Sequence, residues 1–106
     1  MPKYLIKASY TAEGVKGVLK DGGTKRRQAA EAALKSTGGT LEAFYFAFGD
    51  ADAIVIIDAP DNASVAAASM AIGASGLVTV KTVVLLTPEE IDQAVKKGAT
   101  YTPPGR

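Results

Sequence analysis

Two adjacent apolar segments, residues 41–48 and 53–57, constrain the fold of this chain more than any other feature. They read Leu-Glu-Ala-Phe-Tyr-Phe-Ala-Phe and Ala-Ile-Val-Ile-Ile, and a short polar turn at residues 49–52 separates them. The pattern predicts a β-hairpin that is apolar on both faces. Helices predicted elsewhere can cover one face, but a soluble monomer rarely leaves a large apolar patch on the other. We therefore expect a second copy of the chain to cover it.

The remaining segments alternate between strand and helix patterns. Residues 3–10 and 77–86 show the alternation expected of two further strands. Four helices are predicted where a capping residue precedes apolar residues at helical spacing. The predicted helix starts are Thr11, Thr24, Asp61 or Asn62, and Thr87, the last followed by Pro88.

The order strand, helix, strand, strand, helix, strand is that of an α+β, ferredoxin-like βαββαβ fold with an extra C-terminal helix. At 106 residues the chain has room for one core. We expect a single domain over residues 1–98 and a C-terminal tail over residues 99–106. By analogy with small proteins of this class, we expect a dimeric α+β barrel in which two sheets face each other.

Composition narrows the functions that this chain can carry. It has no cysteine and no histidine, which removes thiol nucleophiles, thiolate metal sites, and the commonest general base and metal ligand. The formal net charge is +1, so charge gives no reason to expect a nucleic-acid or membrane partner. Apolar segments are too short for a membrane span, and a second lysine at position 7 interrupts any signal-peptide core. We expect a cytoplasmic protein without a metal or cofactor.

Several segments together resemble the GYD-domain family of small bacterial proteins. They are residues 2–6, residues 10–14, residues 25–27, and residues 42–52, which contain a Gly-x-x-Asp turn at Gly49 to Asp52. The resemblance covers roughly residues 2–95 and implies a dimeric ferredoxin-like fold without an established activity. Family members often carry tyrosine just before the aspartate, where this chain has Ala51.

Polar residues inside apolar strands form the first candidate site. The first strand carries Lys7 and Ser9 on one face, and the last strand carries Thr79 and Lys81 on one face. These strands are neighbours in a ferredoxin-like sheet, so the two lysines are expected to converge on a small anionic or carbonyl ligand. The opposing interpretation is that the lysine stems lie over apolar surface while the ammonium groups reach water.

A second, alternative anion site lies at the predicted start of the second helix, with Thr24, Lys25, Arg26 and Arg27. The preceding glycines resemble a phosphate loop, but Gly23 stands where the lysine belongs and no strand precedes the loop. The opposing interpretation is a kink with a solvated basic face.

Aromatic and acidic residues of the hairpin are further candidates. Phe44, Phe46 and Phe48 are predicted to share one side as core or interface, which leaves Tyr45 on the other side as a pocket residue. The third strand has no aromatic residue, unlike an RNA-recognition motif. Asp50 and Asp52 are expected to bond backbone amides in the turn instead of a metal.

Two functions from different classes remain open. One is a homodimeric, or larger, binding or assembly module that holds a small ligand between sheets. The other is a cofactor-independent enzyme that uses Lys7 or Lys81 with Tyr45 as acid–base groups. A filled interface favours the first, and a pocket beside these residues favours the second.

Overall fold

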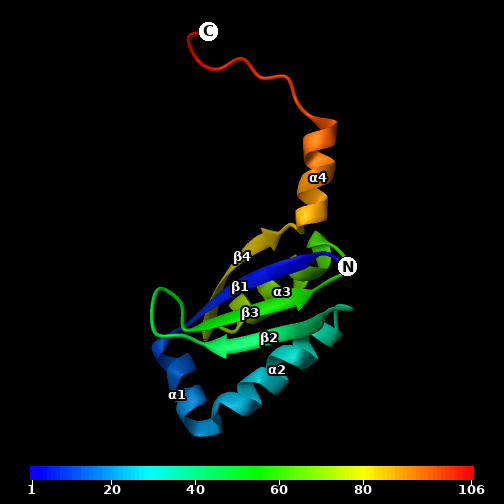
Figure 1. The fold of residues 1–106 in the computed structure, drawn as a ribbon. Coiled ribbons are helices and arrows are strands. Elements are labelled where there is room, and N and C mark those ends of the chain that lie inside the picture. Colours follow the sequence, from blue (N-terminus) through cyan, green and yellow to red (C-terminus); the bar gives the residue numbers. More distant parts are fainter.

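A computed structural model describes residues 1–106, which form four strands and four helices (Figure 1). In chain order the elements are β1 (Lys3–Tyr10), α1 (Ala12–Asp21), α2 (Gly23–Lys35), β2 (Thr40–Phe46), β3 (Ala53–Asp58), α3 (Asn62–Ala74), β4 (Val78–Leu85) and α4 (Pro88–Lys97).

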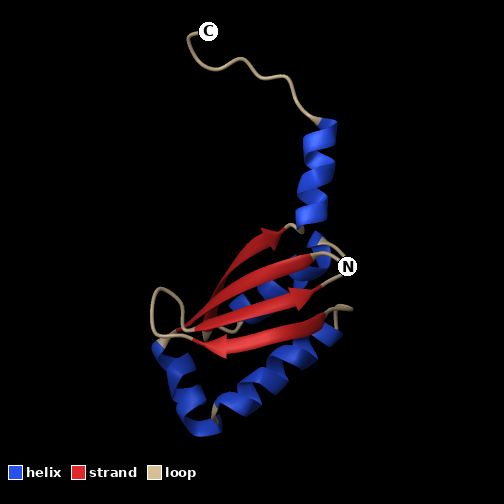
Figure 2. Ribbon diagram, in the orientation of Figure 1, coloured by secondary structure: helices blue, strands red, loops and turns tan.

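The four strands form one antiparallel sheet in the order β2-β3-β1-β4. Helices α2 and α3 pack on the same face of this sheet, α2 against β2 and α3 against β4 (Figure 2). This is the predicted α+β architecture with a ferredoxin-like strand order, and α4 is the additional helix after β4.

The predicted N-cap residues are confirmed at three of the four helices. The side chains of Thr11, Asp61 and Thr87 each accept a hydrogen bond from a backbone N–H in the first turn, and Thr87 completes a capping box with Glu90. The predicted cap at Thr24 is wrong. Helix α2 begins two residues earlier than expected, at Gly23 with Gly22 as its N-cap, because Gly22 adopts φ +81° and its N–H bonds the α1 carbonyl of Val18.

The hairpin is shorter than predicted, and its loop is longer. Pairing of β2 with β3 ends at Phe46 opposite Ala53, and an irregularity in register falls between Leu41 and Ala43. The prediction that Phe48 shares a strand face with Phe44 and Phe46 is therefore wrong. Phe48 lies in the loop and is fully exposed, whereas the other two rings meet edge to face.

The core lies between the sheet and the helices. Along β3 every second residue is buried, namely Ala53, Val55 and Ile57, and the buried Tyr4 of β1 pairs with Ile57 in register. The hydroxyl of Tyr4 donates a hydrogen bond to Asn62 Oδ1 at the start of α3. Alternation along each strand therefore fixes which side chains face the helices.

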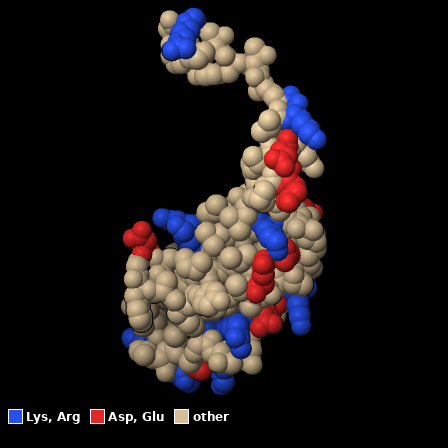
Figure 3. All heavy atoms as spheres, viewed as in Figure 1, with Lys and Arg blue, Asp and Glu red and all other residues tan.

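No helix covers the opposite face of the sheet, here called the open face. Strand alternation and register assign residues of all four strands to this face. They are Lys3, Leu5, Lys7 and Ser9 of β1; Ile54, Ile56 and Asp58 of β3; Thr40, Ala43 and Tyr45 of β2; and Thr79, Lys81, Val83 and Leu85 of β4. Figure 3 shows a largely uncharged surface interrupted by groups of basic and acidic residues. The predicted apolar second face of the hairpin is thus uncovered within one chain.

Helix α4 and the tail project away from the domain (Figure 1). No residue of α4 is buried, and its apolar side chains include the exposed Ile91 and Val95. The radius of gyration is 16.9 Å, against about 13 Å for a compact chain of about 100 residues. None of the four helices combines the length and apolar composition needed to cross a membrane.

Candidate functional site

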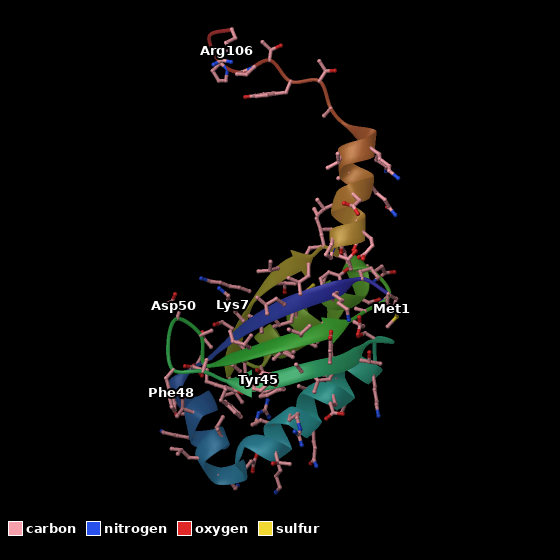
Figure 4. The ribbon with its side chains drawn as sticks, in the orientation of Figure 1. Met1, Lys7, Tyr45, Phe48, Asp50 and Arg106 are labelled. Carbon is pink, nitrogen blue, oxygen red and sulfur yellow. The ribbon has the colours of Figure 1, made fainter.

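The open face brings the residues of the first candidate site onto two neighbouring rows. Lys7 pairs directly with Lys81, and Ser9 pairs with Thr79 two residues farther along. On the other side of β1, Lys7 pairs with Ile54, which in turn pairs with Tyr45. One row across the sheet therefore reads Tyr45, Ile54, Lys7 and Lys81. Figure 4 shows Lys7 and Tyr45 over the sheet, while Phe48 and Asp50 belong to the loop beyond it.

Lys7 and Lys81 have like charges at directly opposed positions on adjacent strands. Such a pair destabilises a sheet because the two Cα atoms are only about 5 Å apart. Both side chains are exposed, and neither forms an ion pair within 4.0 Å. Tyr45 is 70% exposed on the same row. An anion placed between the ammonium groups would offset their repulsion.

Three carboxylates that could balance these lysines, those of Glu42, Asp58 and Asp52, contact other groups. Lys3 Nζ donates to Glu42 at 2.8 Å and to Asp58 at 2.9 Å. These hydrogen bonds raise the pKa of Lys3 above its ordinary value of 10.5, and the bond to Glu42 has the larger effect. Asp52 Oδ2 accepts from the backbone N–H of Tyr10 at 2.8 Å, which is an amide of β1 and not one of the turn as predicted.

The second candidate site begins at an uncapped helix end. Gly22 provides no side-chain hydrogen bond to the N-terminus of α2, and Lys25 is exposed near it. Arg27 Nε lies 4.0 Å from a carboxylate oxygen of Glu31, one turn along the helix. Arg26 instead lines the space between α2 and the sheet. The three basic side chains therefore have different surroundings.

A cavity of about 110 Å³ lies between α2, α3 and the sheet, and no pattern in the sequence predicts it. Its floor is made by the helix-facing residues of β1 and β3, including the directly paired Ala8 and Ala53. Three alanines of α2 form one wall, and Ile72 of α3 forms part of the other. The sequence contains small residues at these positions, but only strand register shows that Ala8 and Ala53 lie side by side on the helix-covered face.

Arg26 is the only charged residue among the fifteen that line the cavity, and fourteen of them are hydrophobic. Its Nε atom is fully buried and has no hydrogen-bond partner. A second hollow, which includes Asp21 and Ser75, shares Arg26, Tyr10 and Ile72 with the cavity. The guanidinium thus lies where an apolar cavity meets a more polar opening.

The fold is a ferredoxin-like α+β domain whose sheet has one uncovered face. Comparison with protein families places residues 4–95 in the GYD domain, and the chain belongs to this family. This confirms the resemblance seen in the hairpin and the basic segment. The Ala51 that departs from the family pattern is buried beside Asp52. No curated protein and no solved structure matches the chain.

Proposed function

We propose that this protein is a homo-oligomeric binding module, at minimum a homodimer, that holds a small anionic or carbonyl ligand between two sheets in an α+β barrel. The uncovered open face carries this proposal. Its central side chains include Ile54 and Ile56, and its edge strand exposes 43% of Val83. Burial of such surface stabilises association by roughly 25 cal/mol per Å² before ordering costs are subtracted.

Helix α4 supports association for a second reason. It has ten residues, and isolated helices of fewer than about 12–15 residues are marginal in water. Its capping box and terminal charges stabilise the ends, but no contact within the chain buries its apolar stripe of Ile91 and Val95. Packing against a second copy would bury that stripe.

Oligomeric state tests the assembly. Sedimentation equilibrium at micromolar concentration should give at least twice the mass of 10.9 kDa. Val83→Asp should shift the equilibrium toward monomer, because burying an unpaired carboxylate costs several kcal/mol, on the order of 3. Met70→Asp is the matched control, since Met70 is 73% exposed on α3, on the other side of the sheet. A monomeric wild type, or equal behaviour of the two variants, would refute the sheet-to-sheet assembly.

The ligand part of the proposal rests on the row of Tyr45, Lys7 and Lys81. Both ammonium groups lack a carboxylate within their own chain, while Ser9 and Thr79 add hydroxyl groups on the adjacent row. When a second sheet covers this face, the lysines lose water and need an anion or a hydrogen-bond acceptor. A phosphate, sulfate or small carboxylic acid has the required charge and size.

Thermal shift with inorganic phosphate, sulfate and pyruvate tests this site. A ligand at one hundred times its dissociation constant should add about 2.7 kcal/mol of apparent stability to wild type. A Lys7→Met, Lys81→Met variant should lose that gain. The control is Lys20→Met, Lys35→Met, which removes the same charge from α1 and α2. Equal stabilisation of all three proteins would place binding elsewhere, and stabilisation of none would refute this ligand class.

The same row also favours a second candidate function, a cofactor-independent enzyme in which Lys7 or Lys81 and Tyr45 act as acid–base groups. The simplest such reaction is exchange of the methyl protons of pyruvate for deuterons, in which a base removes one proton and a solvent deuteron replaces it. Proton NMR in D₂O should then show loss of the methyl signal with wild type and not with Lys7→Met, Lys81→Met. Equal rates for the two proteins would exclude these lysines as catalysts of this reaction.

A further inference from the structure

We propose that the cavity between α2 and α3 is a binding site for small amphipathic monocarboxylates. It lies on the helix-covered face of the sheet, so it is distinct from the open-face site. Its ligand would place an apolar body among the alanines and its carboxylate on Arg26.

Small side chains create the room for the apolar body. Helix α2 packs against β2 at one edge of the sheet and α3 against β4 at the other, which leaves β1 and β3 as a floor between them. On that floor Ala8 lies beside Ala53 in register, and Ala30 and Ala33 line the wall. The volume of about 110 Å³ is somewhat smaller than a cavity of about 150 Å³ that holds benzene. It fits an aliphatic chain of about five carbon atoms.

Arg26 determines the charge of the ligand. Arg26 is the one charged residue that lines the cavity, and it also lines the adjoining polar hollow. Its Nε atom is packed against protein atoms and has no accessible surface, so the terminal amino groups of the guanidinium are the ones that a ligand could reach. Two such groups can bind both oxygens of a carboxylate, and a ligand carboxylate in the hollow would therefore pair with them.

The neighbouring hollow also limits the ligand to one negative charge. It is lined by Asp21, which forms no ion pair with Arg26 within 4.0 Å. A dianion such as a phosphate ester would meet one basic and one acidic group at the opening, and its second charge would be repelled by Asp21. A monocarboxylate would pair with the guanidinium and would carry no second negative charge for Asp21 to repel.

Calorimetry with pentanoate and its neutral analogue pentanol tests the proposal on the full chain. Pentanoate should bind saturably, and pentanol should bind about 10- to 100-fold more weakly, as expected for loss of a hydrogen-bonded charge pair. Arg26→Gln should weaken pentanoate by a similar factor and leave pentanol unchanged. Lys35→Gln is the control in the same helix and should bind like wild type, because Lys35 is exposed and lies outside both candidate sites. Ala33→Leu should abolish binding of both probes by filling the cavity.

Alanine-methyl NMR locates the ligand without relying on the folding of a variant. Pentanoate should shift the methyl signals of Ala8, Ala33 and Ala53 and leave that of Ala43, which is on the open face, unchanged. A shift of Ala43 alone would assign the ligand to the open face and overturn this proposal. Absence of saturable binding would also overturn it. So would pentanoate affinity that falls as protein concentration rises, which would indicate that a second copy fills the cavity.

Discussion

Two glycines of α1 allow a sharp test of how this helix lies against the end of the sheet. A Cβ added at Gly14 would lie 2.1 Å from the backbone oxygen of Leu77, well below the 3.0 Å that real Cβ atoms keep. That carbonyl is held in place because it accepts the backbone N–H of Thr11 at 2.9 Å. At Gly17, three residues later in the same helix, an added Cβ meets nothing within 4 Å.

Gly14→Ala and Gly17→Ala should therefore have opposite effects on the free energy of unfolding. Each gains about 1 kcal/mol from the higher helix propensity of alanine. Only Gly14→Ala must also displace backbone, and such overpacking costs about 1–3 kcal/mol, here at the upper end because a fixed carbonyl is involved. The expected net changes are about 2 kcal/mol of destabilisation for Gly14→Ala and about 1 kcal/mol of stabilisation for Gly17→Ala.

Urea denaturation followed by circular dichroism measures both changes, and thermal melts should separate the two variants by about 15 °C. The slope of the urea transition should be the same for both, since neither variant alters the surface exposed on unfolding. A Gly14→Ala protein as stable as Gly17→Ala would refute the close approach of α1 to residue 77. It would also remove the reason for glycine at position 14.

Three further perturbations probe individual contacts. Hydrogen bonds from Ser64 lower the pKa of Asp61 below its ordinary value of 3.8. Wild type should therefore be more stable than Asp61→Asn above pH 3.8, and thermal melts in acid should show this advantage disappear as the pH falls through the lowered pKa. The pKa of Lys3 is raised above 10.5. Wild type should therefore be more stable than Lys3→Met below pH 10.5, and thermal melts in alkali should show this advantage disappear as the pH rises through the raised pKa. Tyr4→Phe should destabilise by about 1 kcal/mol in urea, because it removes the hydrogen bond to Asn62, and an unchanged midpoint would show that this bond adds nothing to stability.

Local chemistry in the sequence is enough to predict the element order, the strand order of the class and most helix starts. Thr11, Asp61 and Thr87 act as caps through side-chain bonds to residues three positions away, which depend on no distant contact. Strand alternation likewise assigns Lys7 and Ser9 to one face and Ala8 to the other. The Gly-x-x-Asp turn and its neighbours were enough to identify the family.

The ends of helices and strands, and the contacts of the site residues, depended on tertiary structure. The left-handed φ of Gly22 moved the start of α2, and the end of pairing at Ala53 left Phe48 in the loop. Whether Glu42 and Asp58 balance Lys3 or Lys7 is decided by side chains that meet across the sheet, and sequence spacing does not encode such contacts.

The cavity beside Arg26 shows the same division between sequence and structure. The sequence by itself determined that α2 is rich in alanine and that Ala8 and Ala53 lie in strands. Only the pairing of β1 with β3, and the separation of α2 and α3 at opposite edges of the sheet, brought these small side chains around one space. Unfilled volume arises from the packing of elements distant in the chain, so no local pattern of residues specifies it.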